Sequence, residues 1–250
     1  MNLGLENKVA IVTGAGRGIG KSIASSFVEE KVNLILNDID EEILLATIDE
    51  IKGKNKVKID YVIGDMSEED VIDQLIDTAK INYEKLDILV NNAGISPKLP
   101  FEEITLSEYD RVMNVNLRSV WICCQKAVEL MKQQKSGRII NMSSMAGLYG
   151  GIKSAAHYSV SKAGILGLTM TIARQLGPYN ITTNSLAPGR ISTAMTDMLD
   201  QTVIDKIISE IPLGRLGTTQ EVANCVVFLA SEAASYINGQ CIEVSGFYLP

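Results

Sequence analysis

The sequence TGAGRGIG at residues 13–20 follows the apolar run KVAIVTG at residues 8–14 and shares Thr13 and Gly14 with it. Glycines let the backbone turn sharply and approach a phosphate closely, and the helix that follows presents free N–H groups with a partial positive charge. The stretch therefore predicts a pyrophosphate-binding turn between a strand and a helix. Its candidate contacts to the cofactor are Gly14, Arg17, Gly18, Ile19 and Gly20.

Two well-known phosphate motifs do not fit this turn. A strict GxGxxG starting at Gly14 needs glycine at position 19, which is Ile19, and a Walker A loop ending in Gly20-Lys21-Ser22 needs glycine at position 15, which is Ala15. The absence of glycine at position 15 counts against a phosphoryl-transfer enzyme. A turn that binds the pyrophosphate of a dinucleotide cofactor remains the preferred interpretation.

Outward from this turn, short β-branched apolar runs alternate with amphipathic segments, which is typical of βαβ units in a parallel sheet. Strands are expected at 8–14, 32–37, 57–64, 86–94, 137–144, 181–188 and 240–246, and helices near 18–30, 40–52, 67–82, 105–132, 158–177, 196–210 and 218–231. No linker or repeat divides the chain. We therefore expect one α/β domain over residues 1–250, a Rossmann-type doubly wound parallel sheet of seven strands with helices on both faces.

The second expected strand ends in Asn37-Asp38, eighteen residues after Gly20. A dinucleotide fold places at this point the carboxylate that binds the adenosine ribose hydroxyls, and such a carboxylate repels a 2′-phosphate. Arg17 favours NADP instead, because a basic side chain beside the turn could pair with the 2′-phosphate. Since Ile39 adds no second positive charge, Asp38 favours NAD over NADP, and NADP stays open.

Composition excludes several classes of protein. The net charge is −7 and the sequence pI is about 4.9, which argues against nucleic acid and anionic membranes as partners. No segment reaches the roughly 18 apolar residues of a membrane span, and the N-terminus has no targeting pattern, so we expect a cytoplasmic protein. Four cysteines without CxxC spacing and a single histidine make a metal site improbable.

Tyr158 and Lys162 are four residues apart in AHYSVSKAGILG. On a helix, such residues share one face, so a phenol and an ammonium can work together. A nearby positive charge favours the phenolate, and a tyrosine tuned in this way can exchange a proton with an alcohol or carbonyl oxygen. The neighbouring His157 points about 100° away, so we interpret it as a pocket-wall or surface residue.

Several motifs occur in a consistent order along the chain. They are Thr13-Gly14-x-x-x-Gly18-x-Gly20, Asn91-Asn92-Ala93-Gly94, Asn116 in NVNL, Ser143-Ser144, Tyr158-x-x-x-Lys162 and Pro188-Gly189. With these motifs the chain resembles the short-chain dehydrogenase/reductase family from about residue 5 to residue 246.

The resemblance implies a role for each matching residue. Tyr158 would be the catalytic acid or base, Lys162 would lower its pKa and hold the nicotinamide ribose, Ser144 would bind the substrate oxygen, and Asn116 would hold a water that links Lys162 to solvent. The other implied cofactor contacts are Asp65, Met66, Asn92, Ala93, Gly94, Pro188, Gly189, Ile191 and Thr193.

Met195, Met198 and Leu199 suggest an apolar substrate loop or lid at about 190–212. The resemblance implies a homotetramer that pairs the helices near 105–132 and 158–177. Arg190 and Lys153 are possible contacts for an anion. The C-terminus departs from the family, because it reads Val244-Ser245-Gly246-Phe247 where Asp-Gly-Gly is common.

These features predict an NAD(H)-dependent oxidoreductase that interconverts a small secondary alcohol and a ketone. The alternative is an NADPH-dependent reductase of 3-oxoacyl groups on acyl carrier protein, favoured by Arg17 and by the segment IPLGRLGTTQEVANCVVFLAS at 211–231. A catalytically silent dinucleotide-binding regulator is a third hypothesis, disfavoured by the complete set of four candidate catalytic residues.

Overall fold

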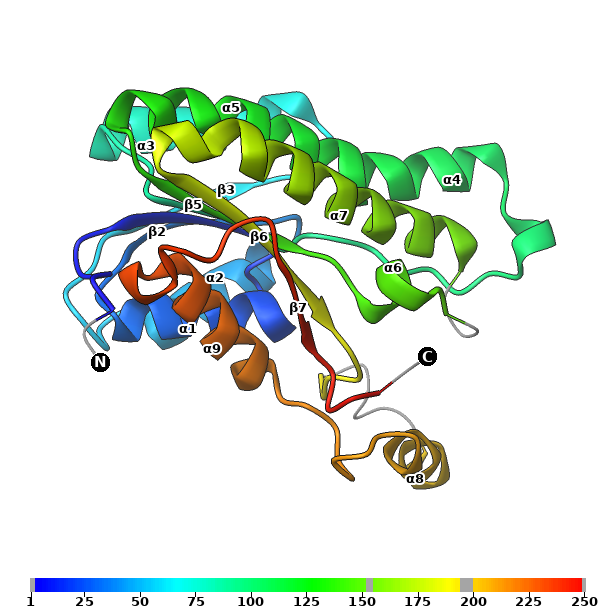
Figure 1. Ribbon diagram of the computed structural model, residues 1–250. Coiled ribbons are helices and arrows are strands. Elements are labelled where there is room, and N and C mark those ends of the chain that lie inside the picture. Colours follow the sequence, from blue (N-terminus) through cyan, green and yellow to red (C-terminus); the bar gives the residue numbers. More distant parts are fainter. Residues whose placement is uncertain (1–2, 152–154, 194–199, 249–250) are drawn as a thin grey trace.

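Seven parallel strands form one sheet in the order β3-β2-β1-β4-β5-β6-β7, with helices on both faces (Figure 1). The computed structural model describes residues 3–151, 155–193 and 200–248. The strands are β1 (Val9–Thr13), β2 (Asn33–Asp38), β3 (Ile59–Ile63), β4 (Ile88–Asn91), β5 (Gly137–Met142), β6 (Ile181–Pro188) and β7 (Cys241–Val244). Because the strand order reverses between β1 and β4, the fold is doubly wound, and the predicted fold class is confirmed.

Two layers of helices cover the sheet. The helices are α1 (Gly18–Glu29), α2 (Glu41–Ile51), α3 (Glu69–Tyr83), α4 (Leu106–Met113), α5 (Ser119–Gln134), α6 (Met145–Tyr149), α7 (Ala156–Leu176), α8 (Gln201–Ser209) and α9 (Thr219–Ala230). Figure 1 shows α1, α2 and α9 below the sheet and α3, α5 and α7 above it. Short 3-10 turns lie at Phe101–Glu103, Gly177–Tyr179 and Glu232–Ala234.

The alternation of side chains along β1 explains the two layers. Ala10 and Val12 belong to the core between the sheet and helices α1 and α9. Val9 and Ile11 belong to the core between the sheet and helices α3 and α5. All five residues of β1 are buried, so both faces of the strand contribute to packing. Full burial of an aliphatic side chain of this size contributes about 1.5–3 kcal/mol, which is why an apolar run without polar interruptions folds as a central strand.

The expected helix at 105–132 is interrupted. Between α4 and α5 the chain makes a π-helical turn over Asn114–Arg118. A π-helical turn fits an extra residue into a helix and is frequent at functional sites. The short helix α6 was not predicted, because residues 145–149 are too few to carry a helical hydrophobic period. Residues 194–199 of the expected lid lie outside the described residues, and α8 forms the later part of that segment.

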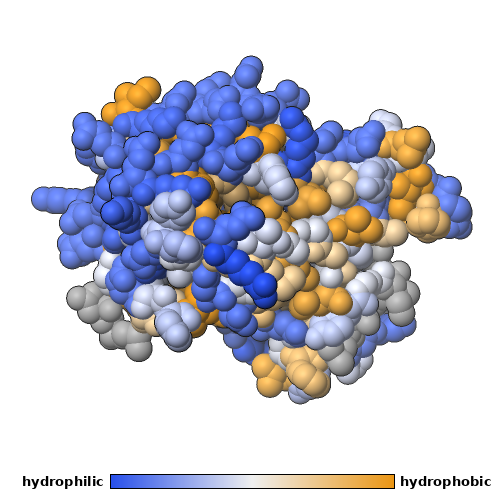
Figure 2. Space-filling model, turned by 45° about the horizontal axis from the view of Figure 1, so that its top comes forward, coloured by the Kyte–Doolittle hydropathy of each residue, from blue (hydrophilic) through white to orange (hydrophobic). Residues whose placement is uncertain are grey.

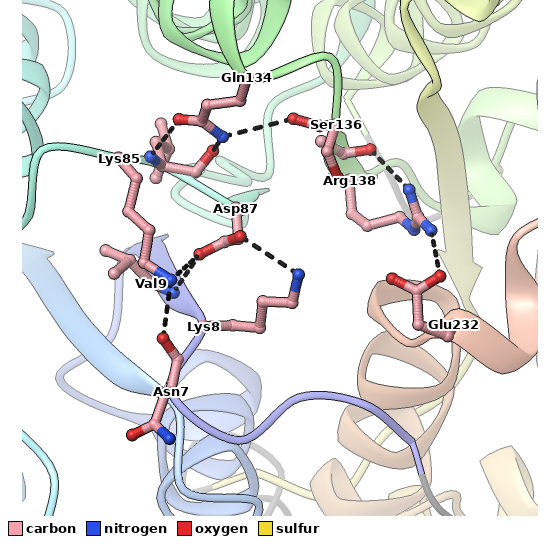
Figure 3. A network of polar contacts seen from close by, with 11 residues as sticks. Asn7, Lys8, Val9, Lys85, Asp87, Gln134, Ser136, Arg138 and Glu232 are labelled. Atoms are coloured by element: carbon pink, nitrogen blue, oxygen red, sulfur yellow. Dashed lines mark hydrogen bonds and ion pairs between the residues drawn. The ribbon is translucent and has the colours of Figure 1, made fainter.

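The amino ends of the strands carry a polar network, shown in Figure 3. Asp87, before β4, accepts a hydrogen bond from the backbone N–H of Val9 at 2.8 Å and pairs with Lys85 at 3.0 Å and Lys8 at 3.4 Å. These contacts join the starts of β1 and β4. Since parallel strands bring their carboxyl ends together at the opposite edge, this network is structural and lies away from the site described next.

Candidate active site

The glycine turn after β1 has a conformation that side chains would prevent. Gly14 and Gly18 have φ angles of +63° and +56°, and a Cβ on Gly20 would lie 2.0 Å from the carbonyl oxygen of Gly14. The Asn92 side chain, after β4, donates hydrogen bonds to the carbonyls of Thr13 (3.0 Å) and Gly14 (2.9 Å). The turn is therefore held open next to the start of α1, where backbone N–H groups are available to an anion.

Asp38 ends β2 beside this turn. Its Oδ2 accepts a hydrogen bond from the backbone N–H of Gly16 at 2.8 Å, and its Oδ1 accepts one from the N–H of Asp40 at 3.2 Å. The residue is 7% exposed, so the carboxylate is fixed in position. Arg17, in contrast, is exposed and has no ion-pair partner among the described residues.

A cavity of about 540 Å³ lies at this carboxyl edge of the sheet. The predicted cofactor contacts that line it are Gly14, Arg17, Ile19, Gly20, Asp38, Asp65, Met66, Asn92, Ala93, Gly94 and Thr193. The glycine turn, the helix start and the fixed carboxylate suit a dinucleotide, which needs a phosphate cradle next to a hydrogen-bond acceptor for its ribose. The residues present therefore fit a nicotinamide dinucleotide.

The remaining predicted contacts lie around this cavity. Gly18, Pro188, Gly189, Ile191, Tyr158 and Lys162 do not line it. Gly189 donates its N–H to the Val244 carbonyl at 3.0 Å, and Ile191 pairs with Gly217 in a short bridge. Lining residues that sequence reasoning missed are Asn37, Ile39, Gly64, Ser67, Ile95, Arg111, Asn114 and Val115. The NVNL motif carried a signal for two of them, because Asn114 and Val115 share the π turn with Asn116.

Tyr158 lies in the first turn of α7 with Ser144 and Lys162 around it. Ser144 is the N-cap of α6 and accepts a hydrogen bond from the N–H of Ala146 at 3.2 Å. Burial raises the pKa of Tyr158 above its usual value near 10, and a hydrogen bond with the Ser144 side chain offsets part of that rise. A phenol whose pKa lies above its usual value near 10 carries its proton at neutral pH.

Lys162 is buried and is bound at both ends. Its ammonium Nζ donates to the carbonyl of Met142 at 2.8 Å, and its own backbone carbonyl accepts a hydrogen bond from the Ser143 hydroxyl at 2.8 Å. Nζ lies 5.9 Å from the centre of the Tyr158 ring. Burial lowers the pKa of Lys162 to about 8. In this geometry the lysine is fixed by the end of β5, and its effect on the Tyr158 pKa stays a prediction.

Asn116 is fully buried on the π turn. Its Oδ1 accepts from the N–H of Ile95 at 2.8 Å, and its Nδ2 donates to the carbonyl of Ile95 at 2.9 Å and to the Ser161 hydroxyl at 3.1 Å. A Cβ placed on Gly94 would lie 3.2 Å from Asn116 Oδ1 and 3.3 Å from Lys162 Nζ. The chain after β4 therefore passes between the asparagine and the lysine.

His157 is buried at 2% exposure, so of its two interpretations, as a pocket-wall or a surface residue, the surface one is wrong. Its Nε2 lies 3.8 Å from a carboxylate oxygen of Glu108 on α4, and neither ring nitrogen has a hydrogen-bond partner among the described residues. The imidazole packs between α7 and α4.

Cys123 and Cys124 are buried, Cys225 and Cys241 are half-buried, and all four are free thiols. Among the described residues, no three side chains of the metal-binding types are grouped to hold an ion. No helix in the described ranges combines the length and the apolar character that crossing a bilayer requires.

Comparison with known proteins gives the family. Residues 14–248 match the family model described as enoyl-(acyl carrier protein) reductase. The chain belongs to the short-chain dehydrogenase/reductase family. It is 38% identical to the 3-oxoacyl-(acyl-carrier-protein) reductase of Thermotoga maritima over 97% of this chain and 98% of the relative. The enzyme of the same description from Staphylococcus aureus is 41% identical over 96% and 97%.

A solved member of the family has the same fold. The crystal structure of a 3-oxoacyl-(acyl-carrier protein) reductase with bound NAD from Brucella melitensis superposes with a TM-score of 0.89 and 32% identity, covering 98% of this chain and 92% of that one. As a short-chain dehydrogenase/reductase, this chain is an oxidoreductase, and the predicted enzyme class is confirmed.

Proposed function

We propose that the chain reduces the ketone of a 3-oxoacyl thioester, such as an acyl group on acyl carrier protein, to the corresponding alcohol. The names of its relatives support a 3-oxoacyl reductase over a general dehydrogenase of secondary alcohols. The observation that carries the proposal is the grouping of the Tyr158 phenol, the Ser144 hydroxyl and the buried Lys162 beside a cavity suited to a dinucleotide.

Reduction needs a hydride at the carbonyl carbon and a proton at its oxygen. A bound reduced nicotinamide cofactor supplies the hydride. Tyr158, protonated at neutral pH, donates the proton, and the Ser144 hydroxyl hydrogen-bonds the same oxygen and stabilises its developing charge. The Lys162 ammonium stabilises the phenolate that remains, and Asn116 holds in place the backbone beside that ammonium.

Replacing Tyr158 by phenylalanine tests the assignment. The variant keeps the ring and loses the proton, so kcat should fall by about 10²- to 10⁴-fold with an acetoacetyl thioester. NADH binding, followed by its fluorescence, should persist. The matched control is Tyr149→Phe, because Tyr149 is an exposed tyrosine on α6 whose hydroxyl donates to Glu243 at 2.8 Å. Equal turnover in the two variants would remove Tyr158 from the mechanism.

For the cofactor we propose NAD(H), with NADP(H) as the alternative. The support is the fixed Asp38 carboxylate on the cavity wall, which accepts hydrogen bonds from ribose hydroxyls and repels a 2′-phosphate. Arg17 also lines the cavity and is the one feature that favours the phosphate.

The test compares kcat/KM for NADH with that for NADPH. Asp38→Ser should weaken NADH binding by roughly 10- to 100-fold, because a hydrogen bond to a charged group contributes about 1.5–3 kcal/mol. It should leave NADPH binding equal or improved. A wild-type preference of about tenfold or more for NADPH would contradict the proposal.

We further propose a homotetramer in which α5 and α7 meet the same helices of a second copy. A groove of about 550 Å³ runs between α5 and α7, and Leu117, Trp121 and Leu168 are among its lining residues. Figure 2 shows apolar side chains gathered on this face, and Trp121 is 57% exposed. Such a patch is unusual on a monomer. Trp121→Arg should lower the mass measured by sedimentation equilibrium, and an unchanged mass would contradict the proposed interface.

A further inference from the structure

Arg190 follows Pro188-Gly189 at the carboxyl end of β6. The cofactor cavity lies mainly at the ends of β1, β2, β3 and β4, with Thr193 beyond β6 also on its wall, and Ser144 follows β5. Because β6 is the next strand beyond β5, with Met142 paired to Leu186, Arg190 leaves the sheet on the β6 side of Ser144. A substrate whose oxygen meets Ser144 can extend toward this side, because most of the cofactor cavity lies at the ends of β1 to β4.

The guanidinium of Arg190 is held by the chain's C-terminal segment. Its Nη2 donates to the hydroxyl of Tyr248 at 3.0 Å, and its Cζ lies 5.0 Å from the centre of the Tyr248 ring. Tyr248 is 6% exposed and packs with Ile207 and Ile211 near α8. The arginine is thus positioned in advance, against an apolar cluster in which charge interactions are stronger than in water.

The charge of Arg190 is not neutralised within the described part of the chain. No described carboxylate lies within 4.0 Å of it, and its Nε is buried without a hydrogen-bond partner there. An arginine side chain has five N–H donors and keeps its charge at all working pH values. A half-buried guanidinium of this kind is usually paired, because leaving its donors unsatisfied is costly.

We propose that Arg190 binds a carboxylate carried by the substrate itself, so that the enzyme prefers a 3-oxoacyl group that bears a second, terminal carboxylate, or a free 3-oxo acid, over an apolar acyl chain. A carboxylate matches the guanidinium fork with two parallel hydrogen bonds. The inference rests on the proposed function, because it concerns the chain attached to the same 3-oxo carbon. It makes Arg190 a specificity-determining residue and leaves the proton transfer to Tyr158.

Two thioesters of equal length test this inference. The N-acetylcysteamine thioesters of 3-oxoadipate and 3-oxohexanoate both have six carbons and differ in a terminal carboxylate against a methyl group. The ratio of kcat/KM, charged over neutral, should favour the charged substrate in the wild type and fall by about 10- to 100-fold in Arg190→Met. Arg190→Lys should retain part of the preference. A ratio that is equal in wild type and Arg190→Met overturns the inference, and because it compares two substrates on one enzyme, partial unfolding does not affect it.

Binding gives a second readout. Acetoacetate titrated calorimetrically into the enzyme with NAD should bind Arg190→Met at least about tenfold more weakly than wild type. If the wild type reduces neither thioester, the proposed function fails, and this titration still decides the inference. An equal dissociation constant for wild type and Arg190→Met overturns it, whereas the tenfold loss supports it.

Discussion

Replacing Asn116 by alanine removes three hydrogen bonds from a fully buried position. Two of them satisfy the backbone N–H and C=O of Ile95, at 2.8 and 2.9 Å, and the third meets Ser161 at 3.1 Å. A buried polar group without a partner costs about 1–3 kcal/mol. With two backbone groups of Ile95 left unpaired, we expect the free energy of unfolding to fall by about 2–5 kcal/mol, or by roughly 5–15 °C in Tm for a chain of this length.

Urea denaturation followed by circular dichroism measures this loss. The matched control is Asn114→Ala, which truncates the same residue type on the same π turn at an exposed position and should change stability by less than about 0.5 kcal/mol. NADH binding should weaken in Asn116→Ala, because Ile95 lines the cofactor cavity. If Asn116→Ala is no less stable than Asn114→Ala, the asparagine does not hold the chain after β4, and the structural role argued here is refuted.

Three other outcomes follow from the geometry. Gly20→Ala should abolish NADH binding in a fluorescence titration, because the new methyl would lie 2.0 Å from the Gly14 carbonyl oxygen; retained binding would show that the turn can move. The pKa of Lys162, about 8, lies below its usual value near 10.4, so the unfolded chain binds more protons between these values. Relative to Lys162→Met, the free energy of unfolding of the wild type should therefore rise by up to about 3 kcal/mol from about pH 8 to pH 10, when both are unfolded in urea across that range. The difference isolates Lys162, because burial raises the pKa values of the Cys123 and Cys124 thiols and their opposite contribution is common to both proteins. Asp87→Ala should destabilise the protein by about 1–3 kcal/mol, since the N–H of Val9 loses its acceptor, yet turnover by the folded fraction should match wild type because the change is at the far edge of the sheet.

The sheet could be predicted because the residues that identify a strand are adjacent in the sequence. The run at residues 8–14 is apolar without interruption, and a glycine turn follows it directly, so strand and cofactor turn are both visible in a few residues. The carboxylate of Asp38 could be placed for the same reason, since a fixed number of residues separates it from the turn. Parallel strands then bring these features to one edge of the sheet.

The site's internal contacts could not be predicted, because they join residues far apart in sequence. Asn116 binds Ile95 across 21 positions, and Lys162 binds Met142 across 20. The π turn at Asn114–Arg118 also has no signature in hydrophobic periodicity, which shifts by only one residue. The raised pKa of Tyr158 depends on burial, and burial is a property of the packed molecule.

The contacts of Lys162 at the end of β5 have a consequence for how this enzyme could be re-engineered. Within the described residues, the side chains of Asn116, Ser144 and Lys162 take all their hydrogen-bond partners from residues 95–161. The hydrogen bonds of these three side chains therefore involve no described residue after β6 and none of α8. If these side chains carry out the proton transfer as proposed, exchanging residues 190–212 for those of a relative should leave their hydrogen bonds intact.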